Sequence, residues 1–295
     1  MIGEILSSWP RRALVGILAV VGLFAACGQL SGIAAGALIH PSRRVVSQPP
    51  PDGCQDVTFN GAGVQLTGWH CTPIKAVRAH LILLHGIADN RASLAGVVRR
   101  FSNRGLNIVA YDSRAHGSSG GDACTYGYFE KQDLRRVIDS LDSAPVVLLG
   151  TSLGAAVALQ EAADDSRVDG VVAAEVFSDL RTVARERAPF VLTDGVIKRA
   201  FEIAQARGAF EIDAVDVTGA ARRMTRPVLV IHGADDRDTP PDHSQRVYAA
   251  LAGPKQLILV PGMGHNKSLS AGAVWSQIET WIETTINASL NTKRH

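Results

Sequence analysis

The chain has 295 residues, of which 46% are hydrophobic and 20% are charged, a composition typical of globular proteins with one large domain or two small ones. Its 30 basic and 28 acidic residues give a formal net charge of +2, and no long basic run is present. This balance excludes the electrostatic footprint of a nucleic-acid-binding protein, so we expect a small-molecule substrate.

The N-terminal segment differs in composition from the rest of the chain. Arg11 and Arg12 precede a run from Ala13 to Ile39 that carries no charge. A membrane span needs about 20 apolar residues, whereas the apolar region of a cleaved signal has about 7 to 15. The sequence therefore predicts an N-terminal membrane anchor in residues 1–40, attached to the bilayer through residues 13–39. Lipidation at Cys27, or secretion after cleavage, is the alternative.

A proline-rich linker at residues 41–53, with Pro49 to Pro51, separates this segment from a folded domain at residues 54–290. The domain opens with two strand-like stretches joined by Gly61-Ala62-Gly63. In a hairpin centred there, Cys54 and Cys71 would lie nearly opposite, at a separation that a disulfide can bridge. A disulfide would indicate an oxidising, periplasmic or extracytoplasmic compartment. Two unpaired cysteines at strand ends are an equal alternative, and the arginines flanking both ends of the apolar run leave the orientation open.

From there the chain alternates short apolar runs with amphipathic stretches, which is the pattern of a mostly parallel sheet with helices on both faces. The predicted strands are Asp56–Asn60, Val64–His70, His80–Leu84, Asn107–Tyr111, Val146–Leu149, Val171–Ala174, Val228–Ile231 and Gln256–Val260. The predicted helices are Ser93–Arg104, Phe129–Leu141, Leu153–Ala163, Pro241–Leu251 and Val274–Thr285. One stretch, 179–223, is helical in pattern throughout and predicts a small lid inserted into the domain.

The strand that ends at Leu149 runs directly into Gly150-Thr151-Ser152-Leu153-Gly154, and a helix follows at once. This is the G-x-S-x-G pattern in the strand-to-helix context that gives it meaning, because the glycines leave room for a sharp, strained turn that exposes the serine. Ser152 is therefore the predicted nucleophile.

A serine nucleophile needs a histidine base and a carboxylate to orient it, and in this fold class they follow in that chain order: serine, acid, histidine. Asp236 and His265 each come just after the carboxyl end of a strand, where open α/β sheets place their sites. Spacing alone does not separate Asp236 from Asp235 or Asp238. His232 and His243 are weaker candidates for the base.

An oxyanion hole needs two backbone N–H groups aimed at the developing charge. Leu153, directly after the nucleophile, supplies one. Ile87, in the loop after an earlier strand and next to Gly86, is the candidate for the second.

The motifs resemble those of the α/β-hydrolase superfamily, within it the serine aminopeptidase-like and lysophospholipase-like hydrolases, over roughly Asp56 to Thr285. The matching segments are Leu83–Gly86, Tyr111–Ser119, Gly150–Gly154, His232–Pro240 and Gly262–Asn266. The resemblance implies that the acid is the fifth residue of H-G-x-x-D with a proline four further on, which selects Asp236. It also implies a structural loop at Asp112 to Ser119, so Asp112 and His116 stay outside the catalytic set.

The resemblance implies acyl transfer without a cofactor or metal: Ser152 attacks a carbonyl, His265 moves the proton, and Asp236 holds the imidazole. We expect a hydrolase of a carboxylic ester or thioester, and the apolar segment and lid favour a lipid-like substrate. A serine peptidase is the first alternative, with Glu186, Asp194 or Glu202 as anchors for a peptide terminus. A non-catalytic binding protein on the same fold is the second. Substrate, membrane side and oligomeric state are not predicted.

Overall fold

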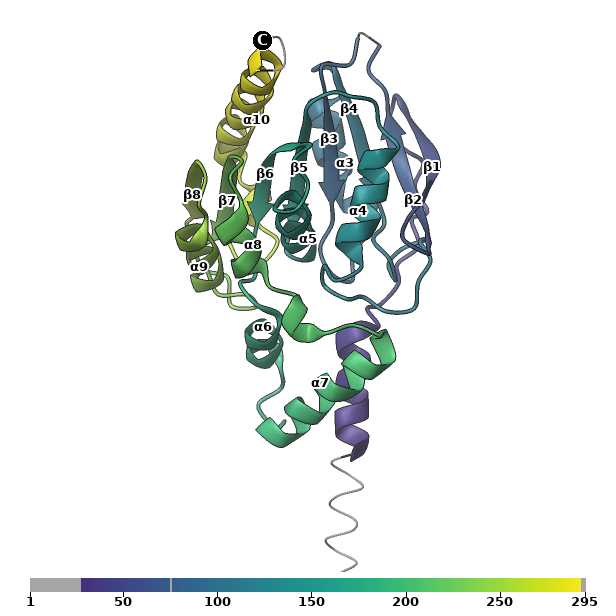
Figure 1. Ribbon diagram of the computed structural model, residues 1–295, viewed down its shortest axis with the longest axis vertical. Helices are drawn as coiled ribbons and strands as arrows, with labels where there is room; N and C mark the ends of the chain where they lie inside the picture. The colour runs from purple at the N-terminus through teal and green to yellow at the C-terminus, as the bar shows by residue number, and fades with distance from the viewer. Residues whose placement is uncertain (1–27, 75, 293–295) are drawn as a thin grey trace, which may run out of the picture.

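The computed structural model describes residues 28–74 and 76–292 of the chain (Figure 1). One eight-stranded sheet runs through it in the order β1-β2-β4-β3-β5-β6-β7-β8. The pairs β1–β2 and β2–β4 are antiparallel, and all the other neighbouring pairs are parallel. The strands are β1 (Cys54–Asn60), β2 (Gln65–Cys71), β3 (Ala79–Leu84), β4 (Leu106–Tyr111), β5 (Val146–Thr151), β6 (Val168–Ala174), β7 (Val228–Gly233) and β8 (Lys255–Val260).

Helices cover both faces of this sheet, which confirms the predicted architecture. The helices are α3 (Ala95–Phe101), α4 (Glu130–Asp139), α5 (Leu153–Ala162), α6 (Leu180–Arg187), α7 (Asp194–Gly208), α8 (Val217–Arg223), α9 (Asp242–Ala250) and α10 (Gly272–Thr292), with short 3-10 turns at Arg91–Leu94, Ile212–Ala214 and Ser268–Ser270. The apolar residues of α3 and α10 pack in one core, whereas those of α4, α5, α8 and α9 pack in the other.

The central strand β5 shows why a continuous apolar run forms a buried strand here. Its side chains alternate between faces, so Val146 and Leu148 join the core under α5, and Val147 and Leu149 join the core under α10. All four are 3% exposed or less. Because both faces are covered, these four positions have no polar side and are all apolar.

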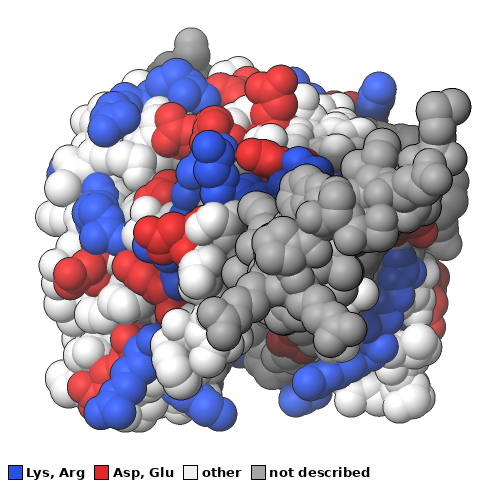
Figure 2. Space-filling model, turned by 90° about the horizontal axis from the view of Figure 1, so that it is seen from below, with Lys and Arg blue, Asp and Glu red and all other residues white. Residues whose placement is uncertain are grey.

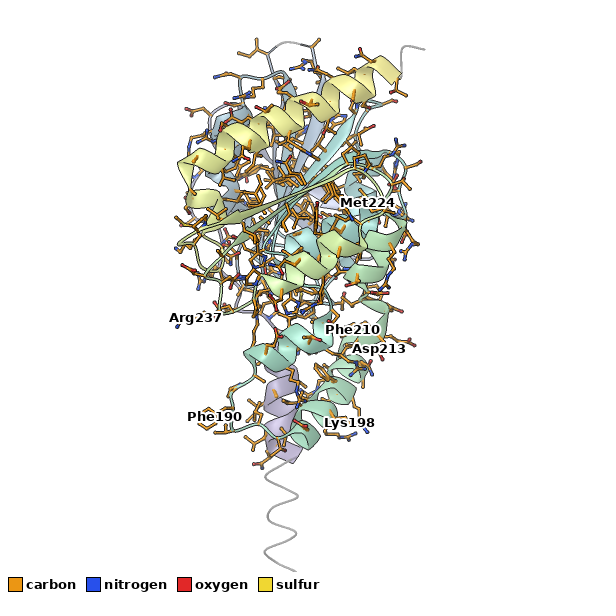
Figure 3. All side chains as sticks on the ribbon, turned by 90° about the vertical axis from the view of Figure 1, so that its left-hand side faces the viewer. Phe190, Lys198, Phe210, Asp213, Met224 and Arg237 are labelled. Carbon is orange, nitrogen blue, oxygen red and sulfur yellow. A yellow bond between two sulfur atoms is a disulfide. The ribbon has the colours of Figure 1, made fainter. Side chains whose placement is uncertain are left out.

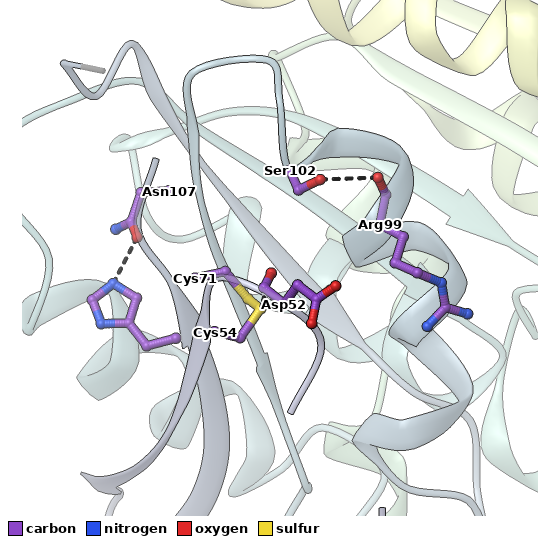
Figure 4. Close-up of a disulfide and its surroundings, with 7 residues drawn as sticks. Asp52, Cys54, Cys71, Arg99, Ser102 and Asn107 are labelled. Carbon is purple, nitrogen blue, oxygen red and sulfur yellow. Dashed lines mark hydrogen bonds between the residues drawn. A yellow bond between two sulfur atoms is a disulfide. The ribbon is translucent and has the colours of Figure 1, made fainter. Parts of the chain in front are cut away.

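The opening hairpin forms with the predicted register. Cys54 lies opposite Cys71 in the β1–β2 ladder, and the two sulfur atoms are bonded (Figure 4). Of the two alternatives that the sequence left open for Cys54 and Cys71, the structure therefore has the disulfide.

The predicted lid lies beyond the carboxyl ends of the parallel strands, where α6 and α7 stand apart from the sheet (Figure 1). The last helix of the predicted lid stretch, α8, instead packs against α5 and α9 in the layer that covers the sheet. Seen from the lid end, the described residues carry basic and acidic side chains side by side (Figure 2). The described part of this face therefore has no surface of a single sign.

A helix at residues 28–39 lies beside α7 (Figure 1). Ser31, Ala35 and Ile39 are buried on it at intervals of four residues, which places them on one face. The hydroxyl of Ser31 donates to the carbonyl oxygen of Val196 over 3.2 Å. This part of the predicted anchor therefore packs against protein.

The remainder of the predicted anchor, residues 13–27, lies outside the described residues. Within 28–74 and 76–292, none of the helices combines the length and the apolar character needed to cross a bilayer. The structure thus gives no support to a membrane-spanning helix at 13–39. The predicted anchor at residues 1–40 includes residues 28–39, which pack against the folded domain.

Candidate active site

Ser152 sits in a sharp turn between β5 and α5. Its backbone has φ 49° and ψ −109°, a conformation that costs energy for any residue other than glycine. The turn is tight because its glycines touch backbone. A Cβ on Gly150 would lie 2.4 Å from the carbonyl carbon of Gly154, and a Cβ on Gly154 would lie 2.3 Å from the carbonyl oxygen of Leu84 in β3. The G-x-S-x-G pattern thus marks a site where only glycine fits.

Asp236 and His265 are brought together from the loops that follow β7 and β8. The Nδ1 atom of His265 donates to Oδ2 of Asp236 over 2.7 Å. The other carboxylate oxygen, Oδ1, accepts the amides of Asp238 and Thr239, each over 2.9 Å. Asp236 is 4% exposed, whereas Asp235 and Asp238 are exposed. Of the three carboxylates, the fold gives only Asp236 this position.

The charge of Asp236 is stabilised by its surroundings. Burial by itself would raise its pKa, but hydrogen bonds from His232, His265 and the amide of Thr239 together hold the pKa well below its usual range. A carboxylate that stays ionised can fix the Nδ1–H tautomer of His265. That tautomer leaves Nε2 as an acceptor, which is the state that a general base needs.

His232 is a second histidine that contacts the carboxylate of Asp236. It is fully buried, and its Nε2 lies 2.8 Å from the carbonyl oxygen of Thr239 and 3.1 Å from Oδ2 of Asp236. Its Nδ1 lies 2.6 Å from the hydroxyl of Ser244. From the sequence, His232 is a weak candidate for the base. In the structure it contacts Asp236 and helps to hold that carboxylate in place.

Arg187, the last residue of α6, reaches from the lid to the base. Its Nη2 lies 3.2 Å from Nε2 of His265, and its guanidinium also donates to the carbonyl oxygen of Asp238 and to the hydroxyl of Thr239. Within the described residues, no hydrogen bond joins the hydroxyl of Ser152 to His265. In this arrangement Arg187 occupies Nε2, the atom that would have to be free for the predicted base to accept a proton from Ser152. The sequence gave no signal for this contact.

The two predicted oxyanion donors lie on segments close to Ser152, the predicted nucleophile. Leu153 is the first residue of α5, where backbone amides point out of the helix end. The loop that carries Ile87 passes close by, because a Cβ on Gly86 would lie 3.7 Å from the Cβ of Ser152. Both donors are thus on segments that border Ser152.

Glu175 is a buried acid that the sequence analysis did not single out. It directly follows β6, is fully buried and has a positive φ of 49°. Its Oε1 accepts the amide of Ser268 over 3.0 Å, three residues after His265. Burial raises its pKa, an effect that hydrogen bonds from Ser268 partly offset. An acidic residue just past a buried strand was the available signal.

The loop from Asp112 to Ser119 is built around the carboxylate of Asp112. That carboxylate is fully buried and accepts the amide and Nη1 of Arg91 and the amide of Ser118. His116 is also fully buried, with Nδ1 2.8 Å from the carbonyl oxygen of Arg114. Burial, aided by the nearby His85, lowers the pKa of His116 to about 4. These residues hold the loop, in keeping with their exclusion from the catalytic set.

The three acids considered as anchors for a peptide terminus are engaged elsewhere. Glu186 lies 2.7 Å from Nε2 of His243, Asp194 pairs with Arg185, and Glu202 pairs with Arg199. As for metals, the described part of the chain holds no cluster of three or more His, Cys, Asp or Glu side chains that could bind one.

Comparison with known proteins identifies the family and the fold. The model of the alpha/beta hydrolase family matches residues 81–274. The uncharacterized protein YqkD of Bacillus subtilis is 29% identical over 70% of each chain. A monoacylglycerol lipase of Mycolicibacterium smegmatis is 25% identical over 76% of this chain and 95% of its own. The structure of the Pyrococcus furiosus esterase Pf2001 superposes with a TM-score of 0.67 at 21% identity, covering 84% of this chain and 98% of the esterase.

Proposed function

Because the chain belongs to the alpha/beta hydrolase family, we propose that it is a serine hydrolase that cleaves carboxylic esters or thioesters. The observation that carries the proposal is the pair of Asp236 and His265, joined over 2.7 Å, together with a serine held in a strained turn between β5 and α5. The esterase and monoacylglycerol lipase among the similar proteins support an ester as substrate.

The proposed reaction proceeds through an acyl-enzyme. The Oγ atom of Ser152 forms a bond to the carbonyl carbon while its proton passes to Nε2 of His265. The amides of Ile87 and Leu153 stabilise the oxyanion. When the carbon–oxygen bond to the leaving alcohol breaks, His265 returns the proton to that alcohol. Water then repeats the sequence, releasing the acid and restoring Ser152.

A fluorophosphonate probe on the full chain tests the proposal, with Ser152→Ala and Ser178→Ala compared in parallel. Ser178 is the matched control because it is equally buried, at 2% exposed, and also lies near a histidine, His243. We expect labelling and hydrolysis of p-nitrophenyl acetate in the wild type and in Ser178→Ala, and neither in Ser152→Ala. A folded wild type that does not react would instead favour a non-catalytic binding protein.

We favour an ester over a peptide substrate. Recognition of a free peptide terminus would need an unpaired charge near the base, whereas Glu186, Asp194 and Glu202 each have a partner of their own. A panel of aminoacyl-p-nitroanilides measured beside the p-nitrophenyl esters compares the two activities. Faster turnover of the anilides would reverse this preference.

We also propose an extracytoplasmic location. The Cys54–Cys71 disulfide supports an oxidising compartment. With residues 28–39 packed on the lid, the uncharged run that is left, residues 13–27, is shorter than the roughly 20 residues of a span and matches a signal region. Membrane attachment would then use lipidated Cys27. Mass spectrometry of the full-length gene product tests this: a chain that retains residues 1–26, with reduced cysteines, contradicts the proposal.

A further inference from the structure

A cavity of about 440 Å³ lies between the helix at residues 28–39 and the lid, within the ~300–1,000 Å³ range of small-molecule sites. Most of its walls come from two places far apart in the sequence. The helix contributes Ala34, Ala37 and Leu38, and the lid contributes Leu180, Ala184 and Phe201. Apart from Arg187, the described side chains that line it are uncharged and almost entirely apolar.

Two residues that line the cavity connect it to the proposed catalytic residues. Ile87, the candidate oxyanion donor, lines it, and so does Arg187, whose guanidinium contacts Nε2 of His265. A molecule that fills the cavity therefore extends toward the point where the carbonyl of an ester would meet Ser152. Among the described residues that line the cavity, Arg187 is the only charged one, and it is the one that contacts His265. The remaining lining is almost entirely apolar, so it suits an apolar group, whereas a polar group there would lack hydrogen-bond partners.

The helix at residues 28–39 is held as a wall of the cavity by directed contacts. The amide of Cys124 donates a hydrogen bond to the carbonyl oxygen of Ile39 over 2.8 Å. The hydroxyl of Tyr126 donates to the carbonyl oxygen of Leu38 over 2.7 Å. On the lid side, Arg207 donates to the carbonyl oxygen of Gly32 over 3.2 Å. These bonds fix both ends of the helix, and the small side chains of Ala34 and Ala37 leave the space open between it and the lid.

The outer rim of the cavity is apolar as well. Leu30 and Ile33 line the cavity yet are 45% and 69% exposed. Phe190, in the loop between α6 and α7, is 99% exposed and lies at the outer end of the lid (Figure 3). Such a rim suits the entry of an apolar chain, because Leu30, Ile33 and Phe190 present apolar side chains to it.

From this geometry we infer that the cavity binds the acyl chain of the substrate and that the helix at residues 28–39 is a structural part of the substrate site. The inference rests on the proposed function and specifies it: the substrate is an ester of a medium- or long-chain fatty acid. The N-terminal segment is then required for selecting the acyl chain, and a chain starting after residue 40 would lack one wall of the site.

The test fills the cavity from each side in the full-length protein. Ala37→Trp adds bulk from the helix, and Ala184→Trp adds it from the lid. Gln29→Trp, on the same helix but away from the cavity, is the matched control. We expect the ratio of kcat/KM for p-nitrophenyl octanoate over p-nitrophenyl acetate to fall about tenfold or more in both filled variants, since a pocket distinguishes chain lengths by about that factor per methylene. Gln29→Trp should leave the ratio unchanged.

A binding measurement separates the inference from the chemistry. The fluorescent fatty acid cis-parinaric acid should bind the Ser152→Ala protein, and binding should weaken about tenfold or more when Ala37→Trp is added. An unchanged octanoate-to-acetate ratio together with unchanged parinarate binding overturns the inference while leaving the proposed function intact. Loss of fluorophosphonate labelling in the wild type would instead remove the proposed function itself.

Discussion

The contact between Gly154 and β3 makes Gly154→Ala a sensitive probe of the oxyanion hole. The new Cβ would lie 2.3 Å from the carbonyl oxygen of Leu84 and 2.6 Å from its carbon. Both atoms belong to the backbone of a buried strand and cannot rotate away. Restoring an ordinary contact separates the first turn of α5 from β3 by about 1 Å. This movement draws the amide of Leu153 away from the loop that carries Ile87.

The expected effects follow from that displacement. Overpacking costs about 1–3 kcal/mol of folding free energy, offset by up to about 1 kcal/mol because alanine favours helix more than glycine does. The variant should therefore fold. A misplacement of about 1 Å lowers the rate of the chemical step about 100-fold, and we expect that loss in both fluorophosphonate labelling and kcat/KM for p-nitrophenyl acetate.

Gly96→Ala is the matched control, because Gly96 is likewise the second residue of a helix, α3, and its Cβ would meet nothing within 4 Å. It should keep full activity and gain up to about 1 kcal/mol of stability. Urea unfolding of both variants establishes that each is folded. If folded Gly154→Ala reacts as fast as the wild type, the spacing of α5 and β3 does not set the oxyanion geometry and the reasoning fails.

Three other perturbations have defined outcomes. Asp236→Asn should lower kcat about 10³- to 10⁴-fold, because the amide favours the wrong tautomer of His265, while Asp235→Asn should retain activity; equal losses in ester assays would contradict the assignment. His116 has its pKa lowered to about 4 by burial, so the unfolded chain takes up a proton first as the pH falls, and the free energy of unfolding should drop by roughly 3 kcal/mol between about pH 6.5 and 4. Urea titrations across that range check this, and a flat profile would argue against a buried neutral imidazole. Reduction of Cys54–Cys71, which closes a loop over a sequence separation of 17, should cost about 3 kcal/mol; calorimetry with and without reductant should show a lower Tm, and an unchanged Tm would mean that the bond does not form.

Local patterns in the sequence were sufficient for the sheet, its covering helices and the elbow at Ser152. A strand segment buried on both faces must be apolar at every position, as Val146 to Leu149 of β5 are. A turn whose Cβ positions overlap backbone must be glycine, as at Gly150 and Gly154. The hairpin register followed from the short Gly61–Gly63 connection. In each case the burial, the tight turn or the short connection constrains residues that are neighbours in sequence. A short stretch of sequence is therefore enough to predict it.

The tertiary structure decided how segments far apart in sequence meet. The apolar run ending at Ile39 has the same composition whether it faces lipid or protein. Long-range bonds, such as that between Ser31 and Val196, 165 residues apart, show that its end lies on the lid. The contacts of Arg187 with His265 and of Glu175 with Ser268 likewise span 78 and 93 residues. An exposed arginine or a strand-end acid has no periodicity that identifies its partner, because the partner is chosen by the packing of the whole chain.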